Sequence, residues 1–370
     1  MLRAATAALS LSVLAACSSL KPFPAHSPSC DAHGDLDALW HCIGNPDPAP
    51  KEGGLASTLR MANGDLTRRL ILNQTPSLAC NTKPRAGFEH RSLPVRNLEA
   101  FVHAGDPGMP VIFVIHGLYD SNSNRYVRYV ASALADRGFG VVAPDMRWHG
   151  CVMAYPSTLG IEESKDLLAW AAAVRNGSVA PSLGNRPIGM IGFSLGALDV
   201  IDTMSAIEAA TLFDAGAISV SPPADLNKVL DGLDRMRTLI GYYFRGTLRI
   251  RNRRLGIGFW ARKPFRLYLE WLVTQHDPAL GPVDRLLKTA EPSTRLATVR
   301  RPLLILAARN DPVLGEAAVD AVVNAQAPRN VRVIATDEGG HIGIIGRDPR
   351  WFVDAMTTFF TNAPHIALQP

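Results

Sequence analysis

A serine between two glycines is the clearest candidate for chemistry in this chain of 370 residues. Ser194 is the centre of the sequence Gly-Phe-Ser-Leu-Gly over 192–196, which follows the apolar run 187–191 and precedes a helical pattern from Ala197. A strand, a sharp turn carrying a serine and a helix form the context of a nucleophile elbow. The flanking glycines remove the Cβ atoms that would collide in such a turn. We therefore predict that Ser194 is a nucleophile.

A serine nucleophile needs a base that takes its proton and a carboxylate that orients this base. With an elbow of this kind, the chain order is Ser, then Asp or Glu, then His. Asp311 follows the apolar segment 301–308 and His341 follows the segment 331–335, and both segments are predicted to be strands. Because ligand sites of open α/β sheets collect at the carboxyl ends of strands, we predict that His341 is the general base and acid and that Asp311 orients it.

Some neighbouring residues have competing interpretations. Asp145 is the rival for the acid, because it also follows an apolar segment. It precedes the serine in the chain, so we expect it to be structural. Asp311 could also cap a helix that begins at Val313, which is compatible with catalysis. We expect His149 and His276 to be surface or loop residues.

The β-branched run 111–115 predicts a further strand, which is followed by His-Gly-Leu-Tyr over 116–119. We predict that the backbone N–H of Leu118 in this turn pairs with the N–H of Leu195 to hold a developing oxyanion. Losing one such donor typically costs ~3–4 kcal/mol of transition-state stabilisation. We expect His116 to support this loop and not to act as the base.

The chain offers no sequence pattern for a cofactor. No His, Cys, Asp or Glu cluster has the spacing of a metal site, and no glycine loop ends in Lys-Ser or Lys-Thr as a phosphate-binding loop does. We therefore expect no cofactor and no metal. Hydrophobic residues make up 47% and charged residues 19% of the chain, a composition that allows a large buried core and excludes a disordered protein.

Segments with the pattern of strands alternate with segments of helical periodicity, which predicts an α/β fold with a mostly parallel sheet and helices on both faces. Strands are expected near 97–103, 111–115, 139–143, 188–193, 215–220, 303–308 and 331–336, and helices near 124–137, 161–175, 195–210, 313–325 and 349–361. About 75 residues, 222–298, interrupt this alternation.

The motifs resemble those of the α/β-hydrolases, and they are most similar to the YheT-like branch, bacterial relatives of the ABHD lipases and acyltransferases. The matching segments lie within 95–365 and are 116–118, Tyr126, 147–151 (Arg-Trp-His-Gly-Cys), 192–197, 309–312 and 339–343. The resemblance implies ester or acyl-transfer chemistry without a cofactor. It also implies that 222–298 is a lid, or cap, over the active site, inserted into a core of 96–221 and 299–370.

The N-terminus predicts export. Arg3, an apolar stretch that ends at Val13 and the small residues before Cys17 are typical of a secretory signal, and the stretch is too short for a transmembrane helix. Leu-Ala-Ala-Cys over 14–17 resembles the bacterial lipobox, in which the cysteine is lipidated; the alternative is an ordinary signal peptide cleaved nearby. Ser18 favours outer-membrane sorting, by analogy with Gram-negative lipoproteins.

This interpretation divides the first 95 residues into a lipoprotein signal peptide over 1–16, a Pro-, Ser- and Gly-rich tether over 17–50 and an N-terminal extension over 51–95 with a small helix and strand. The other cysteines, Cys30, Cys42, Cys80 and Cys151, form an even set in an oxidising compartment. Of the three pairings of four cysteines, we favour Cys30 with Cys42, because their loop is short, and then Cys80 with Cys151.

The predicted lid has an unusual charge pattern. Residues 235–266 contain ten Arg or Lys, no Asp or Glu, and six Tyr, Phe or Trp. Such a strip can dock on an anionic membrane surface, to which each basic residue contributes ~1 kcal/mol. The alternative is an ordinary solvated helix face. Nucleic acid is the rival partner for a basic and aromatic surface, but we do not expect an exported lipoprotein to bind it.

Taken together, these residues predict a membrane-anchored serine hydrolase that acts on small-molecule or lipid carboxylic esters, with a medium or long acyl chain favoured by the apolar lid. Two alternatives stay open. The same residues could transfer an acyl group to an alcohol instead of water, or the chain could be a catalytically silent binding lipoprotein on the same scaffold.

Overall fold

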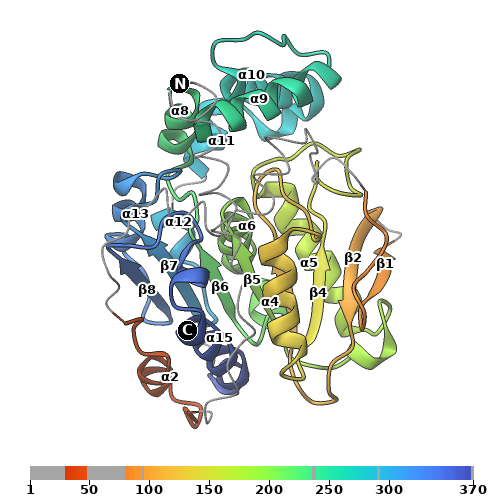
Figure 1. Ribbon diagram of the computed structural model, residues 1–370, viewed down its shortest axis with the longest axis vertical. Helices are drawn as coiled ribbons and strands as arrows, with labels where there is room; N and C mark the ends of the chain where they lie inside the picture. The colour runs from red at the N-terminus through yellow and green to blue at the C-terminus, as the bar shows by residue number, and fades with distance from the viewer. Residues whose placement is uncertain (1–29, 48–79, 94–95, 236–238, 290–291, 368–370) are drawn as a thin grey trace, which may run out of the picture.

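The computed structural model describes residues 30–47, 80–93, 96–235, 239–289 and 292–367. Its strands are β1 (Glu89–Leu93), β2 (Leu98–His103), β3 (Val111–Ile115), β4 (Gly140–Pro144), β5 (Ile188–Phe193), β6 (Ala217–Val220), β7 (Leu303–Ala308) and β8 (Val331–Thr336). They form one sheet of eight strands in the order β1-β2-β4-β3-β5-β6-β7-β8 (Figure 1). The pairs β1–β2 and β2–β4 are antiparallel and all others are parallel. The predicted mostly parallel α/β sheet is confirmed.

The central strands are buried along their whole length, from β3 to β7. Successive side chains of a strand point to opposite faces, and here each face has its own apolar cluster, one containing Ile112 and Val114 and the other Val111 and Phe113. Parallel strands covered on both sides read as continuous apolar runs, which explains why their positions could be predicted. The edge strand β1 is mostly exposed, and its polar residues carry no such signal.

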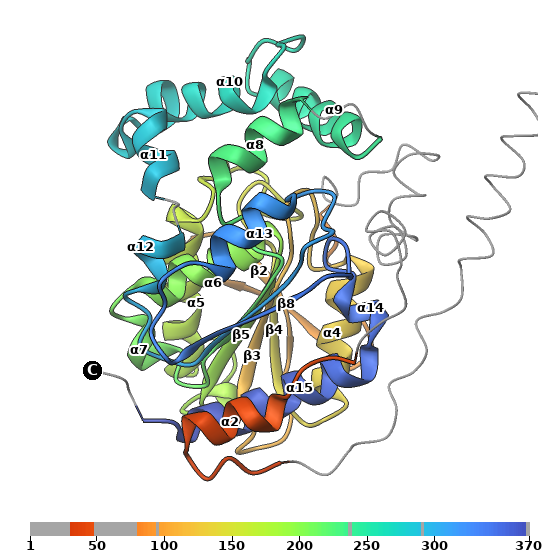
Figure 2. The same ribbon diagram turned by 90° about the vertical axis from the view of Figure 1, so that its left-hand side faces the viewer.

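Helices cover both faces of the sheet (Figures 1 and 2). One apolar cluster brings together residues of α2 (Leu36–Ile43), α4 (Arg125–Ala135) and α15 (Pro349–Asn362). The other contains residues of α5 (Ile161–Arg175) and α6 (Leu195–Ser205). The remaining helices of this part are α7 (Ala209–Leu212), α13 (Glu316–Val323) and α14 (Ile344–Arg347), with short 3₁₀ turns at Pro181–Leu183 and Ala363–His365.

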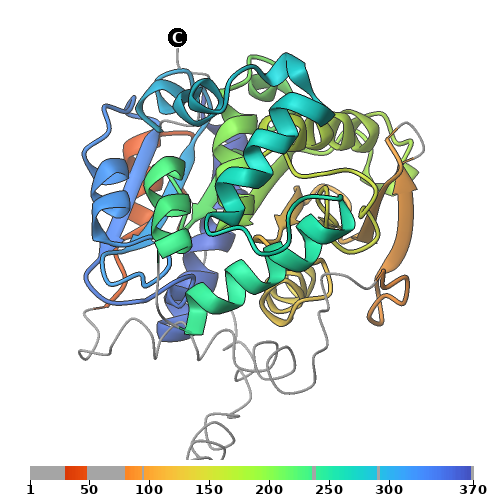
Figure 3. The same ribbon diagram turned by 90° about the horizontal axis from the view of Figure 1, so that it is seen from above.

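The insertion between β6 and β7 is helical, and we call it the cap. It contains α8 (Leu226–Arg235), α9 (Leu239–Arg254), α10 (Pro264–Trp271), α11 (Val283–Thr289) and α12 (Pro292–Leu296), with short turns at Leu272–His276 and Pro278–Leu280. Figures 2 and 3 show α8 to α11 gathered over one end of the molecule. A third apolar cluster joins the cap to Tyr119, Trp148, Leu195 and Leu198 of the core. The cap is therefore packed on the loops at the carboxyl ends of the strands.

The N-terminal part differs from the tether predicted over 17–50. A disulfide between Cys30 and Cys42 closes the segment that contains α2. The N–H of Ala32 donates to Asn362 Oδ1 at 2.7 Å, and the indole of Trp351 donates to the carbonyl of Ile43 at 3.0 Å. Residues 30–47 thus belong to the folded domain, because α2 buries its apolar face against α15. The remaining tether residues, 17–29 and 48–50, and residues 51–79 of the predicted extension lie outside the described residues.

The second disulfide joins Cys80 to Cys151 and holds the segment before β1 on the loop after β4. Both predicted cysteine pairings are therefore present. Cys17 and the signal sequence lie outside the described residues. Within the described ranges, no helix is long and apolar enough to cross a bilayer, and no group of three or more His, Cys, Asp and Glu could hold a metal ion.

Candidate active site

Ser194 occupies a strained turn between β5 and α6. Its φ is 54° and its ψ −118°, a backbone conformation that residues with a Cβ rarely adopt. A Cβ at Gly192 would lie 2.2 Å from the carbonyl oxygen of Gly196, and a Cβ at Gly196 would lie 2.4 Å from that of His116. Because only glycine fits at both positions, this sequence can make the elbow and present the serine at the end of the strand.

The three residues predicted to act together form one hydrogen-bonded chain. His341 Nε2 lies 2.9 Å from Ser194 Oγ, and His341 Nδ1 lies 2.7 Å from Asp311 Oδ2. The Asp311 side chain is fully buried and that of His341 is 9% exposed. An ionised carboxylate only accepts hydrogen bonds, so this contact assigns the imidazole proton to Nδ1. Nε2 is then the acceptor for the serine hydroxyl, which is the orientation that proton removal requires.

The second oxygen of Asp311 fixes its own loop. Oδ1 accepts the N–H of Val313 at 2.8 Å and that of Leu314 at 3.0 Å. The helix α13 begins only at Glu316, and Gly315 stands at its N-cap, so Asp311 caps a turn and not the helix expected from Val313. One carboxylate oxygen thus holds the turn while the other faces the imidazole.

Asn310 and Ser221, which are not among the sequence-predicted residues, hold the histidine loop in place. Asn310 Oδ1 accepts the N–H of Gly340 at 2.8 Å, and its Nδ2 donates to Glu338 at 2.5 Å. Ser221 Oγ, at the end of β6, accepts the N–H of Ile342 at 3.2 Å. In the sequence, the sole indication of this role is that Ser221 and Asn310 lie just after the ends of apolar strands.

The loop after β3 approaches the serine closely. A Cβ at Gly117 would lie 3.1 Å from Ser194 Cβ. Tyr126 Oη accepts the Gly117 N–H at 2.8 Å and donates to Asp120 at 2.8 Å, which fixes the loop from within. Over the described ranges, no group accepts a hydrogen bond from the N–H of Leu118 or Leu195. Both predicted oxyanion donors therefore remain available to a ligand.

Two buried histidines support this loop. His116 Nε2 accepts the N–H of Met146 at 3.0 Å, and His149 Nε2 accepts the N–H of Tyr119 at 2.8 Å. Each is 1% exposed. His116 thus has the supporting role expected of it. His149 lies in a loop, as expected, and is buried there against His116, while His276 is exposed.

Asp145 also braces this region. Its carboxylate accepts the N–H of Asn122 and that of Cys151, each at 2.9 Å. Burial raises the pKa of this carboxyl to about 6, against the two backbone N–H groups that lower it. The carboxylate therefore joins the loop after β3 to the loop after β4, which is the structural role expected, whereas the imidazole of His341 contacts Asp311.

A cap residue reaches the same loops. The side chain of Arg251, in α9, is fully buried between two rings, with its guanidinium carbon 4.8 Å from the centroid of Tyr119 and 4.9 Å from that of Trp148. It also donates to the carbonyl of Trp148. Tyr268 of α10 also stacks on Trp148, with the two ring centroids 4.6 Å apart. Burial lowers the pKa of Arg251 to about 10. Tyr119 directly follows Leu118, so the cap contacts the neighbour of a predicted oxyanion donor.

Comparison with known proteins identifies the family of the chain. The model of the alpha/beta hydrolase family matches residues 111–355, which is more than half of the chain. The chain belongs to the alpha/beta hydrolase family. A relative of this alpha/beta hydrolase, the medium-chain fatty acid ethyl ester synthase/esterase 2 of Saccharomyces cerevisiae, is 32% identical over 111 residues. The match covers 29% of this chain and 24% of the yeast protein, so this alpha/beta hydrolase spans about a quarter of that relative's length.

Solved structures resemble this alpha/beta hydrolase at low identity. The 2,6-dihydroxy-pseudo-oxynicotine hydrolase is 15% identical, with a TM-score of 0.51, and the match covers 87% of this chain and 78% of that one. The esterase Pf2001 of Pyrococcus furiosus is 20% identical, with a TM-score of 0.49, over 78% of this chain and 98% of that one. The first likeness shows a shared fold.

The two buried aspartates give a first test. Asp311→Asn should lower the kcat for a short-chain p-nitrophenyl ester by roughly 10³–10⁴-fold with little change in KM, because the amide no longer fixes the imidazole tautomer. Asp145→Asn should instead lower the free energy of unfolding by ~1–3 kcal/mol, because its NH₂ group faces a backbone donor. Steady-state kinetics and urea denaturation measure the two effects. A larger loss of kcat in Asp145→Asn than in Asp311→Asn would refute the assignment.

The cap contact gives a second test. Arg251→Ala should lower both the thermal stability and the kcat, since it removes two desolvated cation–π contacts, each on the order of 2 kcal/mol, from the neighbour of Leu118. Arg253→Ala, on the exposed side of the same helix, is the matched control and should change neither. Melting curves and ester kinetics are measured on both variants. A normal kcat in a less stable Arg251→Ala protein would show that the contact holds the cap without affecting the site.

Proposed function

We propose that this alpha/beta hydrolase is a serine hydrolase that cleaves carboxylic esters. The observation that carries the proposal is the hydrogen-bonded chain from Asp311 through His341 to Ser194, beside two backbone N–H groups that have no acceptor in the described part of the chain. A nucleophile, a base, an orienting acid and an oxyanion site are the parts that acyl transfer to a serine needs. Membership of the family agrees with this chemistry.

In the first step, Ser194 Oγ attacks the ester carbonyl while its proton passes to His341 Nε2. The carbonyl oxygen becomes an oxyanion and accepts hydrogen bonds from the N–H groups of Leu118 and Leu195. Asp311 accepts from Nδ1–H and stabilises the imidazolium. When the tetrahedral intermediate collapses, the carbon–oxygen bond to the alcohol breaks, and the alcohol leaves with the proton from Nε2. The acyl group remains on Ser194.

In the second step, a water molecule gives its proton to His341 Nε2 and attacks the acyl carbonyl. The same N–H pair holds the second oxyanion. The bond to Ser194 Oγ then breaks, the acid leaves, and the serine takes back a proton from Nε2. Neither step uses a cofactor, because each proton moves between the serine, the imidazole, the substrate and the attacking water.

The proposed substrates are esters with a medium or long acyl chain, as small molecules or lipids. The cap packs on the site loops through apolar side chains, among them Leu226, Leu230 and Val273, and an apolar cover favours an apolar acyl group. The printed name of the yeast relative, a medium-chain fatty acid ethyl ester synthase/esterase, supports the same class.

Acyl transfer is the second candidate, and the same yeast name, which includes both a synthase and an esterase, favours it. An alcohol in place of water in the second step would give a new ester with the same residues. The similarity to the YheT-like branch, which contains lipase and acyltransferase relatives, supports both outcomes. An enzyme with this mechanism differs from a silent binding protein on the same scaffold by forming a covalent intermediate.

Ser194→Ala should abolish ester hydrolysis and labelling by a fluorophosphonate probe while the protein remains folded, because only the attacking hydroxyl is lost. A gel of labelled protein measures the labelling, and a panel of p-nitrophenyl esters with short to long acyl chains measures the hydrolysis. An added alcohol distinguishes transfer from hydrolysis by diverting product from acid to ester. Unlabelled wild-type protein without turnover would support the binding protein instead.

We also propose that the protein is an exported bacterial lipoprotein, held in the cell envelope by Cys17 and facing the periplasm from the outer membrane. The support is the sequence Leu-Ala-Ala-Cys over 14–17 behind an apolar stretch, with Ser18 next. The two disulfides agree with an oxidising compartment. Several acyl chains on one cysteine would give a stable anchor, whereas a single chain binds marginally.

Cys17→Ser should abolish lipidation, because the thiol is the attachment point of the lipid. The variant should then no longer need detergent for extraction. Expression in a bacterium grown with labelled palmitate, followed by membrane fractionation, measures the change. Label in the wild type and none in Cys17→Ser is the expected result. Label in neither would mean an ordinary signal peptide.

A further inference from the structure

The exposed apolar side chains of this protein are concentrated in the cap. Four large hydrophobic residues are exposed over the described ranges, and three of them lie in or next to α9: Tyr242 at 60%, Ile250 at 44% and Trp260 at 80%. The fourth is Ile207, outside the cap, at 68%. Single exposed apolar residues are common on protein surfaces, whereas a group of them marks a site of interaction.

Trp260 is held in its exposed position by the loop between α9 and α10. The backbone carbonyl of Asn252 accepts the N–H of Ile257 at 2.9 Å, and the side-chain Nδ2 of Asn252 donates to the carbonyl of Pro264 at 3.1 Å. Arg249 donates to the carbonyl of Ala261 at 3.2 Å. Both ends of the loop are thus fixed to α9, and the indole lies outside the cap as a consequence of the fold.

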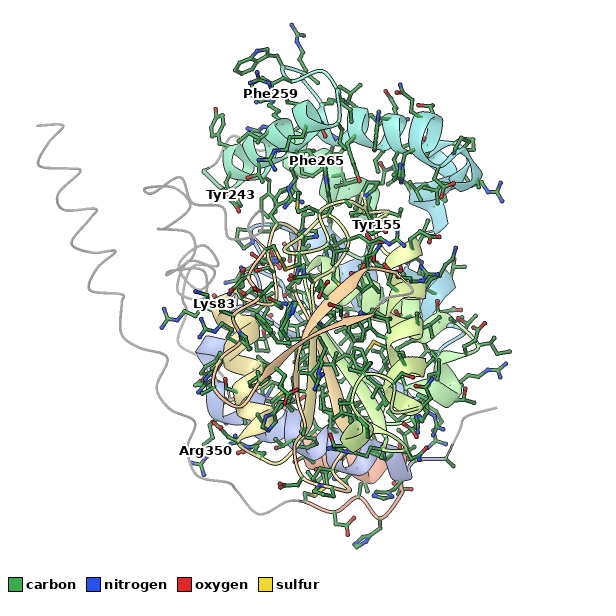
Figure 4. The ribbon with its side chains drawn as sticks, turned by 90° about the vertical axis from the view of Figure 1, so that its right-hand side faces the viewer. Lys83, Tyr155, Tyr243, Phe259, Phe265 and Arg350 are labelled. Carbon is green, nitrogen blue, oxygen red and sulfur yellow. A yellow bond between two sulfur atoms is a disulfide. The ribbon has the colours of Figure 1, made fainter. Side chains whose placement is uncertain are left out.

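The neighbouring aromatic ring lies at the extremity of the molecule. Figure 4 shows Phe259 at the outermost end of the cap, farthest from the sheet. Its ring is 4.5 Å from that of Trp260, and the guanidinium of Arg253 lies 5.8 Å from its centroid. We call the surface formed by Ile250, Arg253, Arg254, 259–260 and 262–263 the cap tip.

The cations of the strip 235–266 have different surroundings. Arg245 and Arg251 are buried, and Arg235 and Arg266 pair with acidic residues at 2.5 and 3.2 Å. The cations of the cap tip are exposed and, within the described ranges, form no ion pair: Arg253, Arg254, Arg262 and Lys263. Of the other two cations of the strip, Arg237 lies outside the described residues and Arg249 donates to the carbonyl of Ala261. The exposed cations without an ion pair in the described part of the strip are therefore the four of the cap tip.

We propose that the cap tip docks on the surface of an anionic phospholipid bilayer. Indole rings favour the boundary between headgroups and acyl chains, and cations beside them are attracted by the negative headgroups. Ile250 decides between lipid and nucleic acid, because an aliphatic side chain has no ring on which a base could stack but is suited to the acyl boundary. The proposal goes beyond the proposed ester hydrolysis and does not depend on it.

The cap tip contains none of the residues of the proposed anchor at Cys17, which lies outside the described residues. The helix α2 lies at the end of the molecule opposite the cap (Figures 1 and 2). Docking can therefore be measured on the full chain carrying Cys17→Ser, which has no lipid. Every variant below shares this background, so membrane binding by the N-terminal residues is common to all and cancels in the comparison.

The test is flotation with vesicles of phosphatidylglycerol and phosphatidylcholine, compared with vesicles of phosphatidylcholine alone. Replacing the four cap-tip cations by Ala should weaken binding to the anionic vesicles by more than about 100-fold, at about fivefold for each residue. Trp260→Ala should weaken it by about tenfold. Added salt should reduce wild-type binding, because exposed charges are screened over ~10 Å at 0.1 M.

Matched controls come from the same chain. Ala at Lys83, Arg91, Arg300 and Arg329, which are exposed outside the cap, removes the same net charge and should leave binding within about twofold of wild type. Ile207→Ala is the control for Trp260→Ala. Hydrolysis of a soluble short-chain ester should persist in the cap-tip variants. Separately, Ser194→Ala should bind vesicles normally, so a failure of docking is distinguishable from a failure of the proposed chemistry.

Equal losses in the cap-tip variant and its charge-matched control would overturn the proposal, because binding would then follow net charge alone. Equally tight binding to phosphatidylcholine vesicles would also overturn it. An oligonucleotide is the final comparison. If the four cations are needed to bind the oligonucleotide but not the vesicles, the cap tip is a nucleic-acid surface and the proposal is wrong.

Discussion

The backbone conformation of Ser194 is the constraint on which the site depends. A positive φ at a residue with a side chain is unfavourable by about 1–3 kcal/mol and persists only where the surroundings enforce it. Here β5 and α6 enforce the positive φ from both sides. The turn is sterically possible because Gly192 and Gly196 have no Cβ that would clash with a backbone carbonyl. The close contact of Gly196 with His116 also brings the loop after β3 next to the serine. One turn thus sets the position of the proposed nucleophile and of the loop after β3 that carries Leu118.

The loop after β4 shows how the surroundings keep this arrangement. In the sequence Arg-Trp-His-Gly-Cys over 147–151, each side chain that can make a contact connects the loop to a different element. Arg147 forms two hydrogen bonds to Asp166 of α5, at 2.6 and 3.1 Å. Trp148 stacks on Tyr268 of the cap, His149 accepts the N–H of Tyr119 in the loop after β3, and Cys151 forms a disulfide with Cys80. The pentapeptide therefore links the cap, the loop after β3 and the segment before β1.

Much of this arrangement could be predicted from the sequence, because its signals are local. Apolar runs place the buried strands, and a strand end followed by Ser194, Asp311 or His341 places the candidates at one edge of a parallel sheet. The strand β1 is polar and pairs only at the edge, so it has no periodic signal. The contacts of Asn310 with 338–340 and of Arg251 with Tyr119 depend on which loops meet in space. No local pattern predicts such partners.

The central claim is that the acyl group of the substrate is bound covalently to Ser194 Oγ during turnover. Its most direct test is the mass of the peptide that contains Ser194, taken from protein quenched with acid during turnover of a p-nitrophenyl ester. This leaving group makes acylation fast, so the acyl-enzyme accumulates before water removes it. The account predicts a peptide heavier by the acyl group of the ester used, with the modification on Ser194. Steady turnover with an unmodified Ser194, or with the acyl group on another residue, would contradict it.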